Sequence, residues 1–349
     1  MKTRILFILK RREDFDLLKH SKEGMQTGLF NSASFVNQML RDSGIESKMV
    51  VVKDNNDIDR EVTNHRPTHV IVEALWVVPQ KFTILHKLHP TVKWIIRLHS
   101  ETPFLAQEGM AFDWLGDYIR CPQVIIAANS PRMLIEVRSY LTALFPSDRT
   151  VGKRIIYLPN YYPIAYSTKV FNLNKNHVDI GCFGAIRPLK NHMMQALAAL
   201  QFATTINKTL KFHINARVEL RGDSVLNNLR SMFQHLAPAG HELVCHTWTP
   251  RAEFLATCST MDIGMQVSFS ETFNIVGADF ISQGVPLICS NEVPWIDQKF
   301  RADPTNSVDI CKHLVETAIN PTVNITSNQA ALTEYSTTTK SGWLEFFDK

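Results

Sequence analysis

The sequence predicts an α/β protein built from two doubly wound domains, each a parallel sheet covered by helices on both faces. Its 349 residues exceed the size at which a single hydrophobic core usually stops growing. Short, continuous apolar runs alternate with longer amphipathic segments, which is the pattern of strands buried on both faces and separated by helices. A polar stretch with two prolines, LPNYYPIAYSTKVFNLNKN, interrupts this pattern near residues 160–177 and indicates a linker between the domains.

The elements follow from the runs in chain order. Before the linker we expect strands in RILFIL, KMVVV, THVIVEAL, VKWIIRL, QVIIAA and RIIYLP, and helices in SASFVNQMLRDSG and PQKFTILHKLH. After it we expect strands in HVDIGCFGAI, TLKFHINA, HELVCHTW, MDIGMQV and VPLICS, and helices in HMMQALAALQFAT and RAEFLATCS. The predicted domains are residues 1–165 and 166–325. Residues 326–349 form a helical tail whose aromatic end, SGWLEFFDK, needs a surface and is expected to pack back towards the first domain.

Composition limits the class of protein. Hydrophobic residues make up 45% of the chain and charged residues 20%, which is typical of a globular protein. A net charge of +4 suits an anionic ligand but does not by itself indicate nucleic acid. The six cysteines are scattered without a CxxC pair, which predicts reduced thiols and no structural zinc. The apolar run in MKTRILFILKRRED is too short for a secretion signal and no run approaches a membrane span, so we expect a cytoplasmic protein.

Ligands of open parallel sheets bind beyond the carboxyl ends of the strands, so two such domains facing each other would form a ligand cleft. GCFGAIRPLKNH ends a predicted strand and presents Arg187 and Lys190 just before a helix that Asn191 could cap. Two cations beside the free N–H groups of a helix start are suited to an anion or a diphosphate. The alternative is a solvated loop that carries two surface cations.

A second candidate segment is SFSETFNIVGADFISQGVPLICS. Glu271 lies just before a predicted helix start, and Asp279 lies about two turns inside it. The N–H groups around Phe273, Asn274 and Ile275 would favour a phosphate, while ionised Glu271 and Asp279 could each accept hydrogen bonds from the hydroxyls of a polar ligand. The alternative is an acid that stabilises the helix dipole, followed by a solvent-facing aspartate.

The first domain offers weaker candidates. His99 follows a buried strand, Asn160 follows the strand in IIYLPNYYP, and Gly24 and Gly28 lie in the loop after the first strand. That loop lacks GxGxxG, so it does not predict a dinucleotide site. The alternatives are a hydrogen-bonded structural histidine, a Pro-Asn turn and a flexible surface loop.

Taken in order, these pieces resemble the retaining glycosyltransferases of the GT-B fold, especially the GT4-like group. FGAIRPLKN is similar to the strand-end Arg/Lys motif of that family. The block from TWTPRAEFL to VPLICS is similar to its helix, strand and Ser-x-x-Glu-x-Phe turn, and Glu271 and Asp279 have the spacing of its E-x7-E motif. RLHSETPF, IIAANS and IIYLPNYYP match the first domain more loosely but in the right order.

The resemblance implies a role for each candidate and a nucleoside diphosphate sugar, with UDP expected, as the donor. It assigns Arg187 and Lys190 to the diphosphate, Glu271 and His99 to the donor sugar, and Asp279 to the ribose. The N–H groups near Phe273, Asn274 and Ile275 would meet the sugar or phosphate, and Asn129, Ser130 and Asn160 would join Gly24 and Gly28 in the loops of the cleft. Neither a metal nor a cofactor is required by such a hexosyltransferase.

Three departures from the family pattern stand out. Asp279 is one methylene shorter than the usual glutamate, and Tyr161 and Asn274 replace glycines. The spacing from Arg187 to Lys190 is also short, which makes Lys190 the more secure of the two cations.

For the acceptor, we expect a hydroxymethylated pyrimidine of phage DNA. The basis is the KRR run at 10–12, weak similarity to phage-encoded glycosyltransferase-like proteins, and the aromatic and histidine residues of the first domain: Trp76, Phe82, His86, Trp94, Phe104 and Trp114. The main rival is a glycosyltransferase of envelope, capsule or lipopolysaccharide glycans. A sugar-nucleotide epimerase of the GT-B fold and a non-catalytic sugar-nucleotide-binding protein also remain open, as does the oligomeric state.

Overall fold

The computed structural model describes residues 2–11, 28–171, 173, 175–219 and 221–348. It divides into two compact units, Met1–Pro163 with Ser336–Lys349 and Ile164–Tyr335, and each is described by itself. We call them unit 1 and unit 2. Gly24 and Arg12, which the sequence singled out, lie outside the described residues.

Unit 1 contains a six-stranded sheet in the order β2-β1-β3-β4-β5-β6, in which every pairing is parallel. Its elements in chain order are β1 (Arg4–Lys10), α1 (Gly28–Asp42), β2 (Glu46–Val52), α2 (Asp57–His65), β3 (His69–Glu73), α3 (Gln80–Leu88), β4 (Lys93–Arg97), α4 (Thr102–Leu105), α5 (Ala111–Arg120), β5 (Val124–Ala128), α6 (Pro131–Leu144), η2 (Val151–Arg154) and β6 (Ile155–Tyr157). The strand order reverses between β1 and β3.

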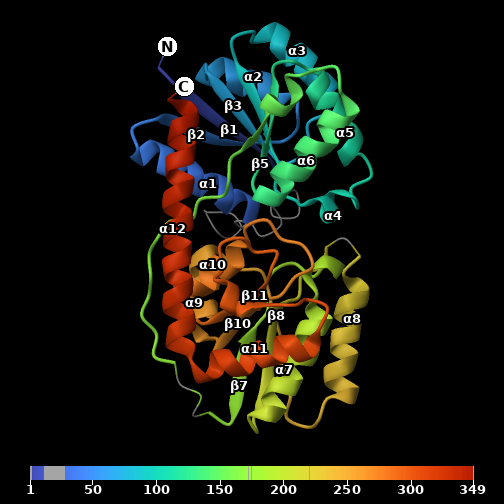
Figure 1. The fold of residues 1–349 in the computed structure, drawn as a ribbon, viewed down its shortest axis with the longest axis vertical. Coiled ribbons are helices and arrows are strands. Elements are labelled where there is room, and N and C mark those ends of the chain that lie inside the picture. Colours follow the sequence, from blue (N-terminus) through green and yellow to red (C-terminus); the bar gives the residue numbers. More distant parts are fainter. Residues whose placement is uncertain (1, 12–27, 172, 174, 220, 349) are drawn as a thin grey trace. The chain divides into compact units, whose positions relative to one another are not determined.

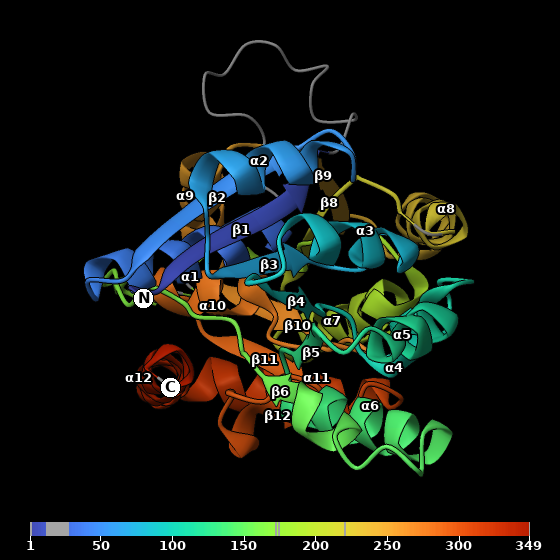
Figure 2. The ribbon, with the colours of Figure 1, turned by 90° about the horizontal axis from the view of Figure 1, so that it is seen from above.

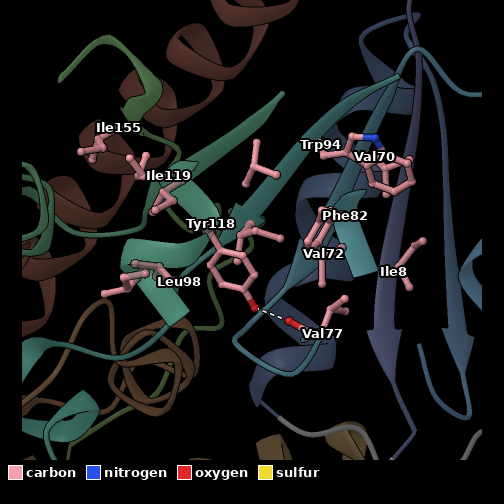
Figure 3. Close-up of a cluster of buried hydrophobic side chains, with 14 of the residues drawn as sticks. Ile8, Val70, Val72, Val77, Phe82, Trp94, Leu98, Tyr118, Ile119 and Ile155 are labelled. Carbon is pink, nitrogen blue, oxygen red and sulfur yellow. Dashed lines mark hydrogen bonds between the residues drawn. The ribbon is translucent and has the colours of Figure 1, made fainter. Parts of the chain in front are cut away.

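Alternate residues of β1 enter two different cores, which is why helices cover both faces of this sheet. Leu6 and Ile8 pack with residues of α2, α3, α5 and α6, whereas Ile5, Phe7 and Leu9 pack with α1. Figure 3 shows the first of these cores, in which the Tyr118 hydroxyl donates a hydrogen bond to the carbonyl of Val77. Unit 1 is therefore doubly wound, as the continuous apolar runs predict.

Unit 2 contains a second parallel sheet in the order β12-β11-β10-β7-β8-β9, which reverses between β7 and β10. Its elements are β7 (His177–Gly181), η3 (Pro188–Lys190), α7 (His192–Thr205), β8 (Thr209–Asn215), α8 (Asp223–Ser231), η4 (Met232–Leu236), β9 (Glu242–His246), α9 (Arg251–Thr260), β10 (Ile263–Gln266), α10 (Ile275–Ser282), β11 (Leu287–Ser290), η5 (Gln298–Phe300), β12 (Arg301–Ala302), α11 (Ser307–Ile319) and the first part of α12 (Pro321–Phe347). Figure 1 labels helices α7 to α12 and strands β7, β8, β10 and β11, and Figure 2 labels β9 and β12.

Helix α10 lies unusually close to the unit 2 sheet because two strand residues under it are glycines. A Cβ built on Gly181 in β7 would lie 2.7 Å from the Phe280 ring, and one built on Gly264 in β10 would lie 2.6 Å from it. The ring also stacks on Phe183, with 5.6 Å between centroids. Glycine is needed at both positions for this approach, which fixes the helix that follows Glu271 against the two central strands.

Helix α12 contributes to both units. Its first part belongs to unit 2, where Asn324 is fully buried and exchanges hydrogen bonds with the backbone of Leu287. Its last part belongs to unit 1, where Trp343 is fully buried beside Phe7 and donates a 2.9 Å hydrogen bond to the carbonyl of Pro159. The prediction that the aromatic tail packs on the first domain is confirmed. Figure 2 shows the C-terminal end of this helix.

The sequence predictions of secondary structure are confirmed for every run assigned to a strand and every segment assigned to a helix. The sequence missed β12, because a strand of two residues has no periodicity to detect. All six cysteines are free. Among the described residues, no helix is long and apolar enough to cross a membrane.

Replacing Trp343 with alanine should destabilise unit 1 by about 3–5 kcal/mol, because it removes a fully buried ring and leaves a cavity. Urea unfolding followed by fluorescence and circular dichroism measures the change. Lys340→Ala, at an exposed position of the same helix, is the control and should alter stability by less than about 0.5 kcal/mol. An unchanged unfolding midpoint for Trp343→Ala would show that the tail is not part of the core of unit 1.

Candidate functional site

The unit 2 candidates gather at the carboxyl edge of the sheet, where the strand order reverses. Lys190 follows β7 and Glu271 follows β10, and these two strands are paired neighbours. A reversal point of this kind is where open α/β sheets bind their ligands, because the loops after the two central strands diverge there. Residues that are 81 positions apart in sequence thus meet at one place.

Lys190 and Glu271 form a largely shielded ion pair, with 12% and 10% of their side-chain surfaces exposed. The interpretation of Lys190 as a solvated surface cation is therefore wrong. Gly184 helps to shape the loop before it: its φ of +115° is one that glycine adopts readily, and a Cβ there would lie 3.9 Å from Cε of Lys190. The Gly184 N–H donates to Oδ1 of Asn215 at 2.9 Å, which ties this loop to the end of β8.

Arg187 precedes the short helical turn η3 that ends at Lys190. Both cations lie near His192, whose pKa is lowered to about 3 by its burial and then by Lys190 and Arg187. Asn191 occupies the N-cap position of α7, as the sequence predicts, but its side chain makes no capping hydrogen bond. It donates instead to the carbonyls of Val267, at 3.0 Å, and Pro304, at 2.8 Å. These bonds join the Lys190 loop to the segments that follow β10 and β12.

Helix α10 begins with Ile275, and Asn274 is its N-cap. The Asn274 backbone is left-handed, with φ 61°, a conformation that glycine adopts most readily. Asparagine tolerates this conformation better than other side chains and adds a cap, because its Oδ1 accepts a 2.8 Å hydrogen bond from the N–H of Gly277. Phe273 is buried against Trp295, whose indole N–H donates to the Phe273 carbonyl at 2.7 Å.

Asp279 is also buried and paired. Only 2% of the residue is exposed, and its Oδ1 lies 2.6 Å from Nη2 of Arg251, the first residue of α9. The alternative of a solvent-facing aspartate is wrong. Arg251 was not among the candidates predicted from the sequence. The pattern that could have predicted it is a cation at a helix start, directly after Thr-Pro and the strand β9.

In unit 1, three of the sequence candidates surround a buried ion pair that the sequence analysis missed. Arg97, at the end of β4, places Nη1 3.1 Å from each carboxylate oxygen of Glu73, at the end of β3. His99 contacts Glu73 through Nε2 and lies 3.3 Å from Nδ2 of Asn129 through Nδ1. The Asn160 side chain accepts a hydrogen bond from Arg97. The pattern that could have predicted this ion pair is a charged residue at the end of each of two apolar strands.

The remaining unit 1 candidates have structural contacts. Ser130 is the N-cap of α6, where its hydroxyl accepts from the Met133 N–H at 3.1 Å and donates to Glu101. Gly28 is the first residue of α1. Of the aromatic residues predicted to face the acceptor, Phe82 and Trp94 are fully buried core residues, and Trp76 and Trp114 pack against that core.

A basic hollow of about 490 Å³ lies at the opposite, amino edge of the unit 1 sheet. Its cationic lining residues are Lys2, Arg4, Arg41, Lys48 and His65. Arg41 and His65 stand in the last turns of α1 and α2. Cations at these positions offset the partial negative charge of the helix C-termini, which accounts for part of this basic character without a ligand.

No family model matches the chain, and no curated protein matches it in sequence. Solved structures match over nearly the full length. They include the trehalose-6-phosphate synthase OtsA without ligand (8% identity, 99% of both chains, TM-score 0.69) and sucrose-phosphate synthase from Thermosynechococcus elongatus (11%, 99% of this chain and 98% of that one, 0.68). Anabaena HepE in complex with UDP is a third (14%, 99% and 100%, 0.63). The chain has the GT-B fold, as its resemblance in sequence predicts.

Substitutions at Asn274 should separate its two contributions to the start of α10. Asn274→Ala should destabilise unit 2 by about 1.5–4 kcal/mol, because alanine loses the cap and pays for the left-handed backbone. Asn274→Gly also loses the cap and the 2.9 Å hydrogen bond from Asn274 to Oε1 of Gln266, but it adopts the left-handed backbone without strain, so it should be more stable than Asn274→Ala by about 1–2 kcal/mol. Urea unfolding of both variants measures the difference. Equal stability of the two variants would contradict the assigned backbone conformation.

Proposed function

We propose that the carboxyl edge of unit 2 binds a nucleoside diphosphate sugar and that the protein transfers the sugar to a hydroxyl group of an acceptor. The observation that carries this proposal is the largely shielded Lys190–Glu271 pair at the reversal point of a GT-B sheet. An ammonium suited to a phosphate and a carboxylate suited to sugar hydroxyls stand side by side there. HepE, a structural neighbour, was solved with UDP, which supports a uridine nucleotide as the donor.

The chemistry requires few groups from the protein. The bond between the anomeric carbon and the diphosphate oxygen breaks, its electron pair stays on the diphosphate, and the acceptor oxygen bonds to the carbon. Lys190, with Arg187 beside it, would stabilise the negative charge that develops on the leaving group. Glu271 would orient the sugar through its hydroxyls, and the buried Asp279–Arg251 pair would contact the ribose.

We propose a retaining reaction in which the acceptor attacks from the side of the leaving group. The acceptor oxygen bonds directly to the anomeric carbon, so no protein nucleophile is needed, and its proton passes to the departing diphosphate, so no protein base is needed. Product analysis by NMR should show the anomeric configuration of the donor. A covalent sugar adduct on Glu271, detected by mass spectrometry, would contradict this mechanism.

Donor binding is tested by a thermal-shift panel of nucleoside diphosphate sugars. A true donor at about a hundred times its dissociation constant adds roughly 2.7 kcal/mol of stability, and UDP-sugars should give the largest shifts. Lys190→Ala should weaken binding of both UDP and UDP-sugar by about 10- to 100-fold, because a charge-assisted hydrogen bond is lost. Glu271→Gln should weaken the binding of UDP-sugar more than the binding of UDP, since Glu271 is proposed to contact the sugar.

Lys211→Ala is the matched control, because Lys211 is a partly exposed lysine of unit 2 whose carboxylate neighbour, Glu242, lies 3.9 Å away. It should bind the donor as the unchanged protein does. If no nucleoside diphosphate sugar shifts the transition, the proposed function is wrong.

For the acceptor, we propose a hydroxymethylated pyrimidine of DNA, supported by the net charge of +4 and by Lys10 and Arg11 at the end of β1. Transfer of labelled sugar to a hydroxymethylated duplex should be detectable, and binding should weaken steeply as salt rises. Lys10→Ala with Arg11→Ala should reduce the salt slope by about 2, whereas Lys340→Ala should leave it unchanged. Transfer to an oligosaccharide or a lipid-linked sugar, with none to DNA, would reject this acceptor in favour of a glycan.

A further inference from the structure

His99 is surrounded by a hydrogen-bonded network that reaches across four strand ends of unit 1. Glu73 ends β3, Arg97 ends β4, Asn129 follows β5, and Asn160 lies shortly after β6. Glu73 and Arg97 have no exposed surface, and the His99 side chain is 12% exposed. A charged pair is costly to bury, so the buried Glu73–Arg97 pair must be stabilised by further hydrogen bonds.

Arg97 is fully occupied in holding this network. Its Nε donates to the Leu158 carbonyl at 3.0 Å, Nη1 donates to both oxygens of Glu73, and Nη2 donates to the Pro159 carbonyl at 3.1 Å and to the Asn160 side chain. Its guanidinium also lies 5.3 Å from the centre of the Trp343 ring. Glu73 is thereby fixed in place with its charge balanced.

The contacts of His99 select one protonation form. Nε2 contacts the Glu73 carboxylate. An ionised carboxylate accepts hydrogen bonds but donates none, so Nε2 carries the proton. Nδ1 lies 3.3 Å from the amide nitrogen of Asn129, which donates, so Nδ1 is unprotonated. Both ring nitrogens are therefore engaged by the protein.

The charges around His99 agree with this form. Burial lowers the pKa of His99, and of the two charged groups that act on it, Glu73 opposes this shift while Arg97 reinforces it. The pKa of Glu73 is lowered although its burial acts in the opposite direction, because Arg97 and His99 both favour its ionised form. An ionised Glu73 beside a neutral His99 is the result.

We propose that Glu73, Arg97 and Asn129 are positioning residues that hold His99 as a neutral imidazole with its proton on Nε2. A histidine held in this form does not act as a general acid or base in the sugar-transfer reaction. The role in the reaction rests on the proposed function, whereas the protonation form of His99 does not. This assignment differs from that of a histidine that accepts the proton of the attacking hydroxyl.

The test is NMR of the full-length protein labelled with 15N-histidine, in which the two ring nitrogens report the tautomer directly. His99 is assigned by its loss in His99→Gln. We expect one neutral form with the proton on Nε2, and we expect it to persist below about pH 6.5, where an ordinary histidine is half protonated. A proton on Nδ1, or a doubly protonated ring at neutral pH, would overturn the proposal.

Two variants test the positioning residues. Asn129→Asp is nearly isosteric and turns the donor to Nδ1 into an acceptor, so His99 should become doubly protonated and titrate at a higher pH. Glu73→Gln removes the fixed acceptor of Nε2 and should mix the two tautomers. Because that change leaves Arg97 buried without its partner, the variant can fail to fold, and Asn129→Asp then decides the question alone. A His99 signal in Asn129→Asp that matches the unchanged protein would overturn the proposal.

Glu101→Gln is the matched control. Glu101 is a second buried carboxylate of unit 1, but it contacts Ser130 and Arg132 and not His99. The His99 signals should be the same in this variant. The rate of transfer, or of donor hydrolysis, measured as a function of pH tests the role of His99 in the reaction. In the unchanged protein the rate should show no change caused by titration of His99, and in Asn129→Asp it should show one.

Failure of this inference is distinguishable from failure of the proposed function. If no sugar nucleotide binds but His99 has the expected tautomer, the function is wrong and the positioning of His99 stands. If a sugar nucleotide binds and His99 titrates as an ordinary histidine, the function stands and the positioning is wrong.

Discussion

The pairing of carboxylates with cations, all largely shielded from solvent, is the interaction on which the carboxyl edges of both sheets depend. Glu73 is held by Arg97, Glu271 by Lys190 and Asp279 by Arg251. An isolated carboxylate in such surroundings would shift its pKa and lose its charge, and an isolated cation would be equally costly. Each pair therefore gives both of its members a partner of opposite charge in a place that is largely shielded from water.

This constraint also affects how a ligand is bound. A phosphate that reaches Lys190 must share the ammonium with Glu271, and sugar hydroxyls that reach Glu271 must share the carboxylate with Lys190. When a single molecule carries both a phosphate and sugar hydroxyls, neither the ammonium of Lys190 nor the carboxylate of Glu271 is left without a partner. A ligand with a phosphate and no sugar, or the reverse, satisfies only half of the pair. The pair is thus suited to molecules that join a phosphate to a polyol.

The fold could be predicted from the sequence because it depends on local patterns. Runs such as RILFIL and VKWIIRL are apolar on both faces, and this decides that the strands are buried and parallel. The segment around Glu271 was found in the same way, from an acid beside a helix start. Asn274 was identified only as a departure from a family pattern, and its left-handed φ of 61° supplies the physical reason for the residue that stands there.

The ion-pair partners could not be predicted, because they are set by strand order and not by local sequence. Arg97 lies 24 residues from Glu73, Arg251 lies 28 from Asp279, and Glu271 lies 81 from Lys190. Nothing in a period of two or 3.6 residues indicates which strand ends become neighbours. Asn191 illustrates the same limit. Its place before a helix predicted a side-chain cap, but its amide donates instead to the carbonyl of Val267, just after β10.

Helix α12 has a consequence for the order in which the chain folds. The part of unit 1 that ends at Pro163 is synthesised first, but the helix that supplies Trp343 to its core is separated from it in sequence by all of unit 2. During synthesis, the surface that receives Trp343, beside Phe7 and Arg97, remains uncovered until the end of α12 emerges. Unit 2 can complete most of its core earlier, so the segment made before unit 2 belongs to the unit that is finished after it.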